Sequence, residues 1–359
     1  MYEEIDKENM YSLLFKFPDD FMKAYNLSKE TLLPTLKTIL IEHEFDKVVV
    51  LGMGGSGIAG EIAVDLFYDK INVPILSVKD FKLPLCALEN SLVFSISYSG
   101  NTYETLRATK RVIQARNNFI IGVTSNGELE RMLNRKNYPV IKIPTGYPPR
   151  CAISYLTMPL IVTLSTLSRI DMDEDIKYTY NQLIKMRENI RREVRENKNL
   201  AKAYAKKILR KIPLIYSYRP YCSVAVRFKD QLNENSKMLA KFDHIPEMNH
   251  NDIMLFEAIQ IEKEKVLVAI LRGSEEDLDV RARIDYLKRI LEKENIDFIE
   301  ISVKSGKRLS EIFEMIYLTD LISYYLAIYR SIDPTPVHLI SDLKKYLAQV
   351  RQKLGIEEQ

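Results

Sequence analysis

Short apolar runs, each followed by glycine or hydroxyl residues and then by an amphipathic stretch, recur along the first half of the chain. The run KVVVL at 47–51 leads into GMGGSGIAGEIAVDLF, and SLVFSI at 91–96 leads into SYSGNT and a helical stretch at 103–114. The apolar runs at 118–123 and 138–143 predict two more buried strands. Wholly apolar strands that alternate with helices are typical of a parallel sheet covered on both faces.

The second half repeats this alternation with fewer glycines. Apolar runs at 212–216, 266–271 and 298–303 predict three strands. The stretches with helical periodicity are 224–238, 278–294, 309–332 and 337–352. The last of these has one apolar face, formed by Ile340, Leu343, Leu347 and Val350. The pattern therefore predicts an α/β fold with two tandem three-layer α/β/α domains and mainly parallel sheets.

A highly charged segment lies between the two halves, after a predicted helix at about 150–168. Residues 174–211 alternate Lys, Arg and Glu at helical spacing, which could form either a basic patch for polyanions or a solvated connecting helix. The interleaved glutamates favour the connecting helix. The predicted organisation is an N-terminal domain at 1–170 with an N-terminal helical segment, a charged helical connector at 171–211, and a C-terminal domain at 212–359 with a C-terminal helix.

Composition and charge exclude several classes of protein. The 359 residues are 46% hydrophobic, and 52 basic against 49 acidic residues give a formal charge of +3, which argues against nucleic acid or a membrane surface as a partner. Cys86, Cys151 and Cys222 form no CxxC pair and no disulfide framework. The N-terminus lacks a signal-peptide pattern, and the apolar stretch at 152–167 is short and interrupted by polar residues. We expect a soluble cytoplasmic protein.

The first glycine-rich loop leaves three interpretations open. Gly52, Gly54 and Gly57 match the GxGxxG pattern of dinucleotide-binding folds, and Asp80 lies near the end of the next predicted strand, where an acidic residue would bind a ribose. A tight strand-to-helix turn would also need glycines. Ser56 among the glycines instead favours an anion site built from a hydroxyl and loop amides.

The second loop favours phosphate binding. Ser97, Ser99 and Thr102 follow a buried strand and open a helix, so their hydroxyls would lie beside the N-terminal amides of that helix. Helix capping alone would explain one hydroxyl but not three. Together with Gly55 and Ser56, this loop predicts a cradle for a sugar phosphate rather than for a pyrophosphate.

Both loops resemble the phosphosugar-binding loops of sugar isomerase (SIS) domains, and further motifs extend the resemblance over nearly the whole chain. These motifs are PPR at 148–150, QLNENSK at 231–237, EMNHND at 247–252 and DPTPVHLISDLKKYL at 333–347. In this order the chain resembles the archaeal-type bifunctional phosphoglucose/phosphomannose isomerases. The resemblance implies two SIS domains and an aldose–ketose isomerase that converts glucose 6-phosphate and mannose 6-phosphate to fructose 6-phosphate. It implies neither a cofactor nor a metal.

The same resemblance implies roles for four residues. Glu234 corresponds to the base that moves the proton between C1 and C2, and Arg150 to the group that stabilises the enediolate. An arginine at the start of a helix opposes the helix dipole, which independently suggests an anionic target. His250 and Lys344 correspond to ring-opening groups, and the family donates this histidine across a homodimer interface.

Some alternatives remain open from the sequence. The grouping of His244, Glu247, His250 and Asp252 raises a metal site, but its spacing fits no common ligand pattern. Thr335 and Val337 compete as the residue that helps to accept mannose 6-phosphate. A sugar-phosphate-binding SIS regulatory protein without catalysis is the alternative function, although the residues before the first strand do not suggest a DNA-binding arm. An aminosugar synthase would need an N-terminal cysteine nucleophile, and the chain begins Met1-Tyr2.

Overall fold

The computed structural model describes residues 2–258 and 263–355 and contains two parallel sheets, one in each half of the chain. The first sheet has the order β2-β1-β3-β4-β5. Its strands are β1 (Lys47–Leu51), β2 (Ile75–Val78), β3 (Ser91–Ile96), β4 (Phe119–Thr124) and β5 (Val140–Lys142). All neighbouring strands in it run parallel, which confirms the parallel sheet predicted from the apolar runs.

The second sheet repeats this topology with the order β7-β6-β8-β9, again fully parallel. Its strands are β6 (Ile212–Tyr218), β7 (Lys241–Ile245), β8 (Val266–Arg272) and β9 (Asp297–Ser302). Strand β7 was missed by the sequence analysis because KFDHI is largely polar. An edge strand pairs on one side only and can keep polar side chains in solvent, so its apolar signal is weak.

The strand order reverses at β1, which lies between β2 and β3. In an open parallel sheet such a reversal leaves a crevice at the carboxyl ends of the strands, because the two following loops diverge to opposite faces. The loops after β1 and β3 are the two glycine- and serine-containing loops, so the topology places them side by side.

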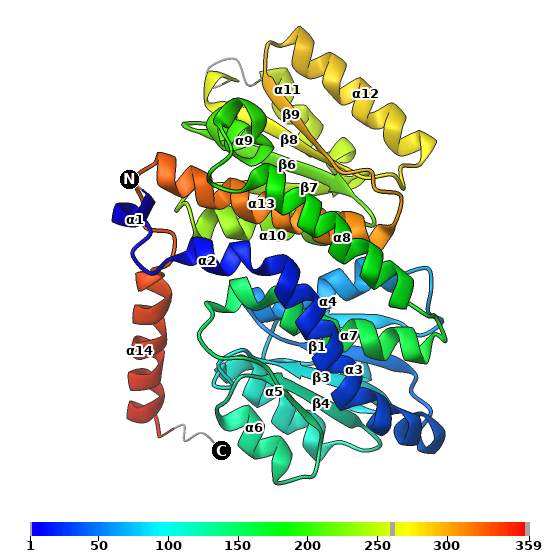
Figure 1. Ribbon diagram of the computed structural model, residues 1–359. Helices are drawn as coiled ribbons and strands as arrows, with labels where there is room; N and C mark the ends of the chain where they lie inside the picture. Colours follow the sequence, from blue (N-terminus) through cyan, green and yellow to red (C-terminus); the bar gives the residue numbers. More distant parts are fainter. Residues whose placement is uncertain (1, 259–262, 356–359) are drawn as a thin grey trace.

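Helices cover both faces of the two sheets (Figure 1). In the first half they are α1 (Tyr2–Ile5), α2 (Met10–Phe15), α3 (Phe17–Glu42), α4 (Gly54–Phe67), α5 (Tyr103–Gln114), α6 (Glu128–Asn134) and α7 (Ile153–Leu167). In the second half they are α8 (Asp173–Ile190), α9 (Leu200–Ile208), α10 (Cys222–Glu234), α11 (Leu255–Ala258), α12 (Leu278–Lys293), α13 (Arg308–Tyr329) and α14 (His338–Lys353). Short 3₁₀ helices include η2 (Pro149–Ala152) and η4 (Glu247–His250).

Helices α7 and α13 form the centre of the molecule. Helix α7 packs on α3 and α4, and α13 packs on α8, α9 and α10, within one continuous hydrophobic core that spans both halves. The segments 149–167 and 308–329 are long and apolar enough to cross a bilayer, but 83% and 94% of their most apolar windows are buried here. Their hydrophobicity therefore serves the core of this fold.

The charged segment at 174–211 does not form the single connecting helix that its periodicity predicted. It forms α8 and α9, separated by residues 191–199, and both helices pack against α13. Asn199 caps α9 by accepting a hydrogen bond from the amide of Lys202 at 3.1 Å. The periodicity correctly predicted a charged outer face. The interruption between α8 and α9 depends on how each helix packs on α13.

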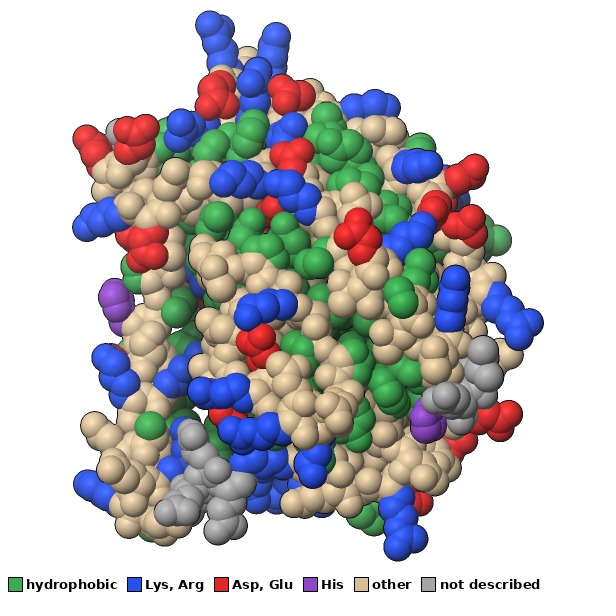
Figure 2. All heavy atoms as spheres, turned by 60° about the horizontal axis from the view of Figure 1, so that its bottom comes forward, with side chains coloured by type: hydrophobic (Ala, Val, Ile, Leu, Met, Phe, Trp, Pro, Cys, Tyr) green, Lys and Arg blue, Asp and Glu red, His purple; other side chains and the backbone are tan. Residues whose placement is uncertain are grey.

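Helix α14 stands beside the body of the protein and buries none of its residues (Figure 1). On the apolar face predicted for this helix, Ile340 is 43% exposed and Leu343 55%, while Leu347 and Val350 are partly buried, so the described residues cover this face only in part. Leu339 and Tyr346, outside that face, are 85% and 62% exposed. Near its end, the guanidinium of Arg351 lies 4.1 Å from the ring centroid of Tyr103 at the start of α5. Figure 2 shows a hollow between α14, at the left, and the rest of the molecule, with Lys and Arg side chains along it.

Candidate active site

The loop after β1 is shaped by its glycines. Gly54 has a φ of +51°, and a Cβ on Gly57 would lie 2.7 Å from the carbonyl oxygen of Gly52, so the turn into α4 is too tight for larger residues. The turn buries Ser56 and aims its hydroxyl at the second loop, where it accepts a hydrogen bond from the amide of Tyr98 at 3.2 Å. The two loops are thus joined directly.

The loop after β3 gathers the hydroxyls that the sequence analysis singled out. The Ser97 and Thr102 hydroxyls are 2.9 Å apart, and the Ser99 hydroxyl accepts a hydrogen bond from the amide of Asn101 at 3.3 Å. Thr102 precedes α5 without capping it through its side chain. Amides of the first turn of a helix point outward and bind anions, so this corner suits a phosphate group.

Arg150 lies next to the first loop at the entry to α7. A Cβ on Gly55 would lie 3.0 Å from the Arg150 amide nitrogen, so the glycine allows the loop to pack on the arginine backbone. The Arg150 side chain is nearly fully buried. Its Nε donates to Asn235 Oδ1 at 2.7 Å, and its Nη2 donates to the carbonyl oxygens of Pro334 and Thr335, both at 2.9 Å.

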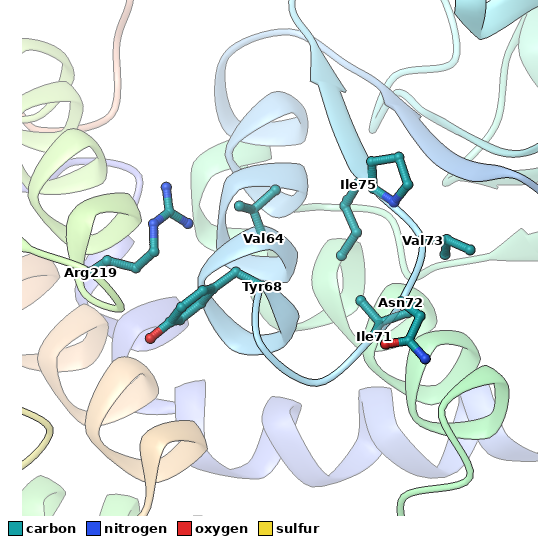
Figure 3. Close-up of a pocket in the computed structure, with 8 residues that line it drawn as sticks. Val64, Tyr68, Ile71, Asn72, Val73, Ile75 and Arg219 are labelled. Atoms are coloured by element: carbon teal, nitrogen blue, oxygen red, sulfur yellow. The ribbon is translucent and has the colours of Figure 1, made fainter.

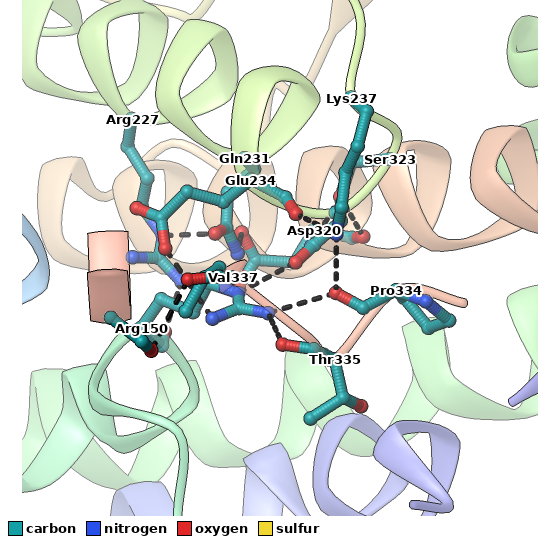
Figure 4. A network of polar contacts seen from close by, with 12 residues as sticks. Arg150, Arg227, Gln231, Glu234, Lys237, Asp320, Ser323, Pro334, Thr335 and Val337 are labelled. Atoms are coloured by element: carbon teal, nitrogen blue, oxygen red, sulfur yellow. Dashed lines mark hydrogen bonds and ion pairs between the residues drawn. The ribbon is translucent and has the colours of Figure 1, made fainter. Parts of the chain in front are cut away.

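Glu234 completes the centre of the site as the last residue of α10 (Figure 4). Its Oε2 lies 3.3 Å from Arg150 Nη1, and its side chain is 26% exposed, so the carboxylate faces both the guanidinium and solvent. A guanidinium has five N–H groups, and those of Arg150 make four hydrogen bonds to the described residues. The remaining N–H is on Nη1, the nitrogen that contacts Glu234. A ligand oxygen could therefore bind Arg150 beside the carboxylate.

Lys237 belongs to this site although the sequence analysis did not select it. Its Nζ donates to the carbonyl oxygen of Glu234 at 2.6 Å and to that of Asp333 at 3.3 Å, joining the end of α10 to the segment before α14. Burial, and then the positive charge of Arg150, lowers the pKa of Lys237 below its ordinary value of 10.5. The sequence feature that could have identified Lys237 is its position in the motif QLNENSK, in which only Glu234 was assigned a role.

The structure does not bring His250 and Lys344 to this centre within one chain. His250 is exposed in η4 and Lys344 is exposed on α14, and neither side chain forms a hydrogen bond or ion pair with the described residues. Leu239, Met254 and Leu255, from the segments on either side of His250, are 69%, 55% and 43% exposed. The segments before and after His250 in the chain therefore carry uncovered apolar side chains, as α14 does.

Two residues of the alternative metal site, Glu247 and Asp252, are engaged in other contacts. Asp252 pairs with Lys241 and accepts a hydrogen bond from the Tyr216 hydroxyl at 3.1 Å, and Glu247 accepts one from the Asn251 amide group at 3.0 Å. Within the described parts of the chain, no three His, Cys, Asp or Glu side chains are grouped to hold a metal ion.

A separate surface cavity lies away from these groups. It has a volume of about 350 Å³ and is lined by Val64 of α4, by Tyr68 just after that helix, by residues 71–75 leading into β2, and by Arg219 (Figure 3). These residues lie at the end of α4 opposite to Ser56. The hydroxyls, the uncapped helix start and the Arg150–Glu234 pair are at the carboxyl ends of β1 and β3, so the chemistry of the site is there.

Comparison with known proteins shows what this chain is similar to. Residues 197–347 match a family described as the bacterial phospho-glucose isomerase C-terminal SIS domain. The chain is 34% identical to a bifunctional phosphoglucose/phosphomannose isomerase of Caldicellulosiruptor bescii, over 95% of this chain and 100% of that protein. It is 35% identical to a protein of the same description from Thermoplasma acidophilum, over 85% and 90% of the two chains. In fold it is similar to a hypothetical protein from Thermus thermophilus, with a TM-score of 0.73, 14% identity, and coverage of 94% and 89%.

Proposed function

Because this chain belongs to the family of bifunctional phosphoglucose/phosphomannose isomerases, we propose that the carboxylate–guanidinium pair of Glu234 and Arg150 beside the two loops is its active site. The protein is an isomerase that interconverts glucose 6-phosphate or mannose 6-phosphate with fructose 6-phosphate. Both relatives are named as enzymes, and the match covers 100% and 90% of their lengths. The regulatory alternative is therefore without support. The single observation that carries the proposal is a buried arginine with one free N–H next to a partly exposed carboxylate.

The phosphate group binds in the corner between the two loops. Ser56, Ser97, Ser99 and Thr102 supply hydroxyls, and the uncapped start of α5 supplies amides and the positive end of a helix dipole. The close packing of Gly55 on Arg150 then sets the distance between the bound phosphate and the reacting carbons.

Isomerisation moves a proton between C1 and C2 of the open-chain sugar through an enediolate. Glu234 accepts the proton from one carbon and returns it to the other, as a general base and then a general acid. Arg150 donates its free N–H to the sugar oxygen on which negative charge develops. A donor already oriented in a site that excludes water stabilises that charge without reorganising during the reaction.

Thr335 is proposed to help the site accept mannose 6-phosphate. Its hydroxyl is buried and has no hydrogen-bond partner among the described residues, while its carbonyl oxygen holds Arg150. A buried hydroxyl left unpaired is costly, so a substrate hydroxyl that pairs with it gains affinity. Val337 remains the competing residue, but it offers no polar atom.

We propose that the complete site forms in a homodimer. The exposed apolar residues of α14 and those around His250 would be covered by a second copy, and a two-fold interface would bring His250 to the partner's pocket. There His250 and Lys344 would open the sugar ring. We also place the protein in the cytoplasm, since its three cysteines are free.

The test of the function is a coupled assay with each hexose 6-phosphate, run with and without a chelator. We expect glucose 6-phosphate and mannose 6-phosphate both to give fructose 6-phosphate, at rates that the chelator leaves unchanged. Free glucose should not be turned over, because it lacks the group that the two loops bind. Absence of turnover with all three hexose 6-phosphates would refute the proposed function.

The shared site can be tested by mixing two inactive variants, Glu234→Gln and His250→Ala, under conditions of subunit exchange. A mixed dimer has both defects in one pocket and neither in the other. With equal amounts and random exchange, about half of the dimers are mixed, so roughly a quarter of the wild-type activity should return. No recovery, with exchange confirmed by native mass spectrometry, would place His250 in the pocket of its own subunit.

A further inference from the structure

A fully buried ion pair lies beneath Arg150, between α10 and α13 (Figure 4). Asp320 of α13 accepts hydrogen bonds from Arg227 of α10, at 2.6 Å from Nη2 and 3.1 Å from Nε. Gln231, one turn further along α10, donates to the same carboxylate at 2.8 Å. Arg227 and Asp320 are 2% and 1% exposed, so their charges are compensated within the protein rather than by water.

The first branch of this network reaches the backbone of Arg150. Arg227 Nη2, which pairs with Asp320, also donates to the carbonyl oxygen of Arg150 at 2.7 Å. The position of this carbonyl fixes where the Arg150 side chain starts. Asp320 therefore acts on Arg150 through the orientation of Arg227.

The second branch reaches the guanidinium of Arg150. Asn235 accepts from Arg150 Nε and donates through its amide group to the Ser323 hydroxyl at 2.9 Å. That hydroxyl donates to the carbonyl oxygen of Asp320 at 2.7 Å. Both ends of Arg150 are thus tied to one turn of α13, and Asn235 and Ser323 are fully buried as well.

The network holds two direct ion pairs. Arg227 pairs with Asp320, and Arg150 pairs with Glu234. If Asp320 were made neutral, Arg227 would be a buried cation without a counter-ion. It would then have to move or find other acceptors, and either change shifts the carbonyl oxygen of Arg150.

We propose that Asp320 is a positioning residue that holds Arg150 at its working distance from Glu234 and from the substrate oxygen. Asp320 touches no substrate and acts through Arg227 on one side and through Ser323 and Asn235 on the other. The proposal rests on the proposed function of Arg150 in stabilising the enediolate. A displacement of about 1 Å in such a group can reduce turnover by about a hundredfold.

The test compares Asp320→Asn with Asp65→Asn as a matched control. Asp65 is also a buried carboxylate that holds α10, but at the opposite end of the helix, where it accepts from the Ser223 amide at 2.6 Å and pairs with Arg219 at 3.1 Å. We expect Asp320→Asn to lower kcat by about tenfold or more with KM within about twofold. Asp65→Asn should leave both constants within about twofold of wild type. Equal losses of kcat in the two variants, or no loss in Asp320→Asn, would overturn the positioning role.

A binding measurement separates this proposal from the proposed function. The probes are 5-phosphoarabinonate, which carries a carboxylate where the enediolate forms, and arabinitol 5-phosphate, which is neutral there. In calorimetry, wild-type protein should bind 5-phosphoarabinonate more tightly than arabinitol 5-phosphate. Asp320→Asn should reduce the ratio of these two affinities by about tenfold without weakening the binding of arabinitol 5-phosphate. A wild-type preference that survives in Asp320→Asn refutes only the positioning role, whereas no preference in the wild type refutes the role of Arg150 and the proposal with it.

Ser323→Ala keeps the proposal testable if Asp320→Asn does not fold. This change removes one hydroxyl and breaks only the branch that runs through Asn235. The preference for the carboxylate probe should fall by a few-fold while the thermal midpoint stays close to wild type. An unchanged preference in folded Ser323→Ala would contradict the coupling of α13 to Arg150.

Discussion

Replacing Glu234 by glutamine is the sharpest test of the proposed chemistry, because the change keeps the size of the side chain and removes its ability to accept a proton from carbon. The structural cost should be small. Arg150 keeps its hydrogen bonds to Asn235 and to two carbonyl oxygens, and the glutamine oxygen can still accept from Nη1. The lost charge pair is 26% exposed on the Glu234 side, so we expect a loss of unfolding free energy of at most about 1 kcal/mol.

The catalytic cost should be much larger. General base catalysis contributes about 10²–10⁴ in rate, which corresponds to roughly 3–5 kcal/mol in the activation free energy. The loss should appear in kcat, while KM for fructose 6-phosphate stays within about threefold, because the phosphate loops are unchanged.

The assay couples glucose 6-phosphate formation to a dehydrogenase, and a second measurement follows deuterium exchange at C1 of fructose 6-phosphate by NMR. The matched control is Asp230→Asn, one turn earlier on α10, where the carboxylate is 35% exposed and pairs with Lys229. This control should retain wild-type turnover. A folded Glu234→Gln protein that isomerises and exchanges deuterium within about tenfold of wild type would show that another group is the base.

Three further changes test separate parts of the structure. In Gly100→Ala, the added Cβ would stand at a φ of +66° and would clash with the carbonyl oxygen of Asn126. The phosphate loop must therefore move, and KM for each substrate should rise by about tenfold or more. An unchanged KM would contradict the phosphate site. Thr335→Val should lower kcat/KM for mannose 6-phosphate about tenfold more than for glucose 6-phosphate without loss of thermal stability, and equal losses for both sugars would favour Val337. Burial raises the pKa of Asp65 from 3.8 to about 6, so between pH 3.8 and pH 6 the folded state binds a proton that the unfolded state has lost. The stability that this proton contributes is lost as pH rises through about 6. The unfolding free energy of wild type relative to Asp65→Asn should therefore fall by about 2 kcal/mol between pH 4 and pH 7 in urea titrations, and a constant difference would argue against this shift.

Sequence patterns predicted those parts of the fold whose signal is local. The strands at 47–51 and 91–96 and the helix at 103–114 lie where the apolar runs and the periodicity placed them, because a buried parallel strand must be apolar on both faces. The two proposed phosphate loops could be predicted for a similar reason, since glycines and hydroxyls next to a strand end are needed within a few residues of one another. Strand β7 gave no such signal, because an edge strand is defined by its neighbour β6 rather than by its own residues.

For the candidate site, the resemblance to a family supplied the names of Glu234 and Arg150, and the fold supplied their arrangement. Arg150 bonds to residues 84, 85 and more than 180 positions away in the chain, which no local pattern encodes. Asp320 is one of three acidic residues in the mostly apolar α13, and only the packing of α13 on α10 shows that it pairs with Arg227.

By itself, the sequence determined most of the strands and helices and the two loops rich in glycine and hydroxyl residues, because these depend on the steric and solvation properties of neighbouring residues. The tertiary structure alone decided which loops meet, which face of α14 stays uncovered, and which N–H of Arg150 remains free beside Glu234 among the described residues. The reason is physical. The order of strands in a sheet and the docking of helices are set by the burial of the whole apolar surface at once, and the position of each polar side chain in the site follows from that packing.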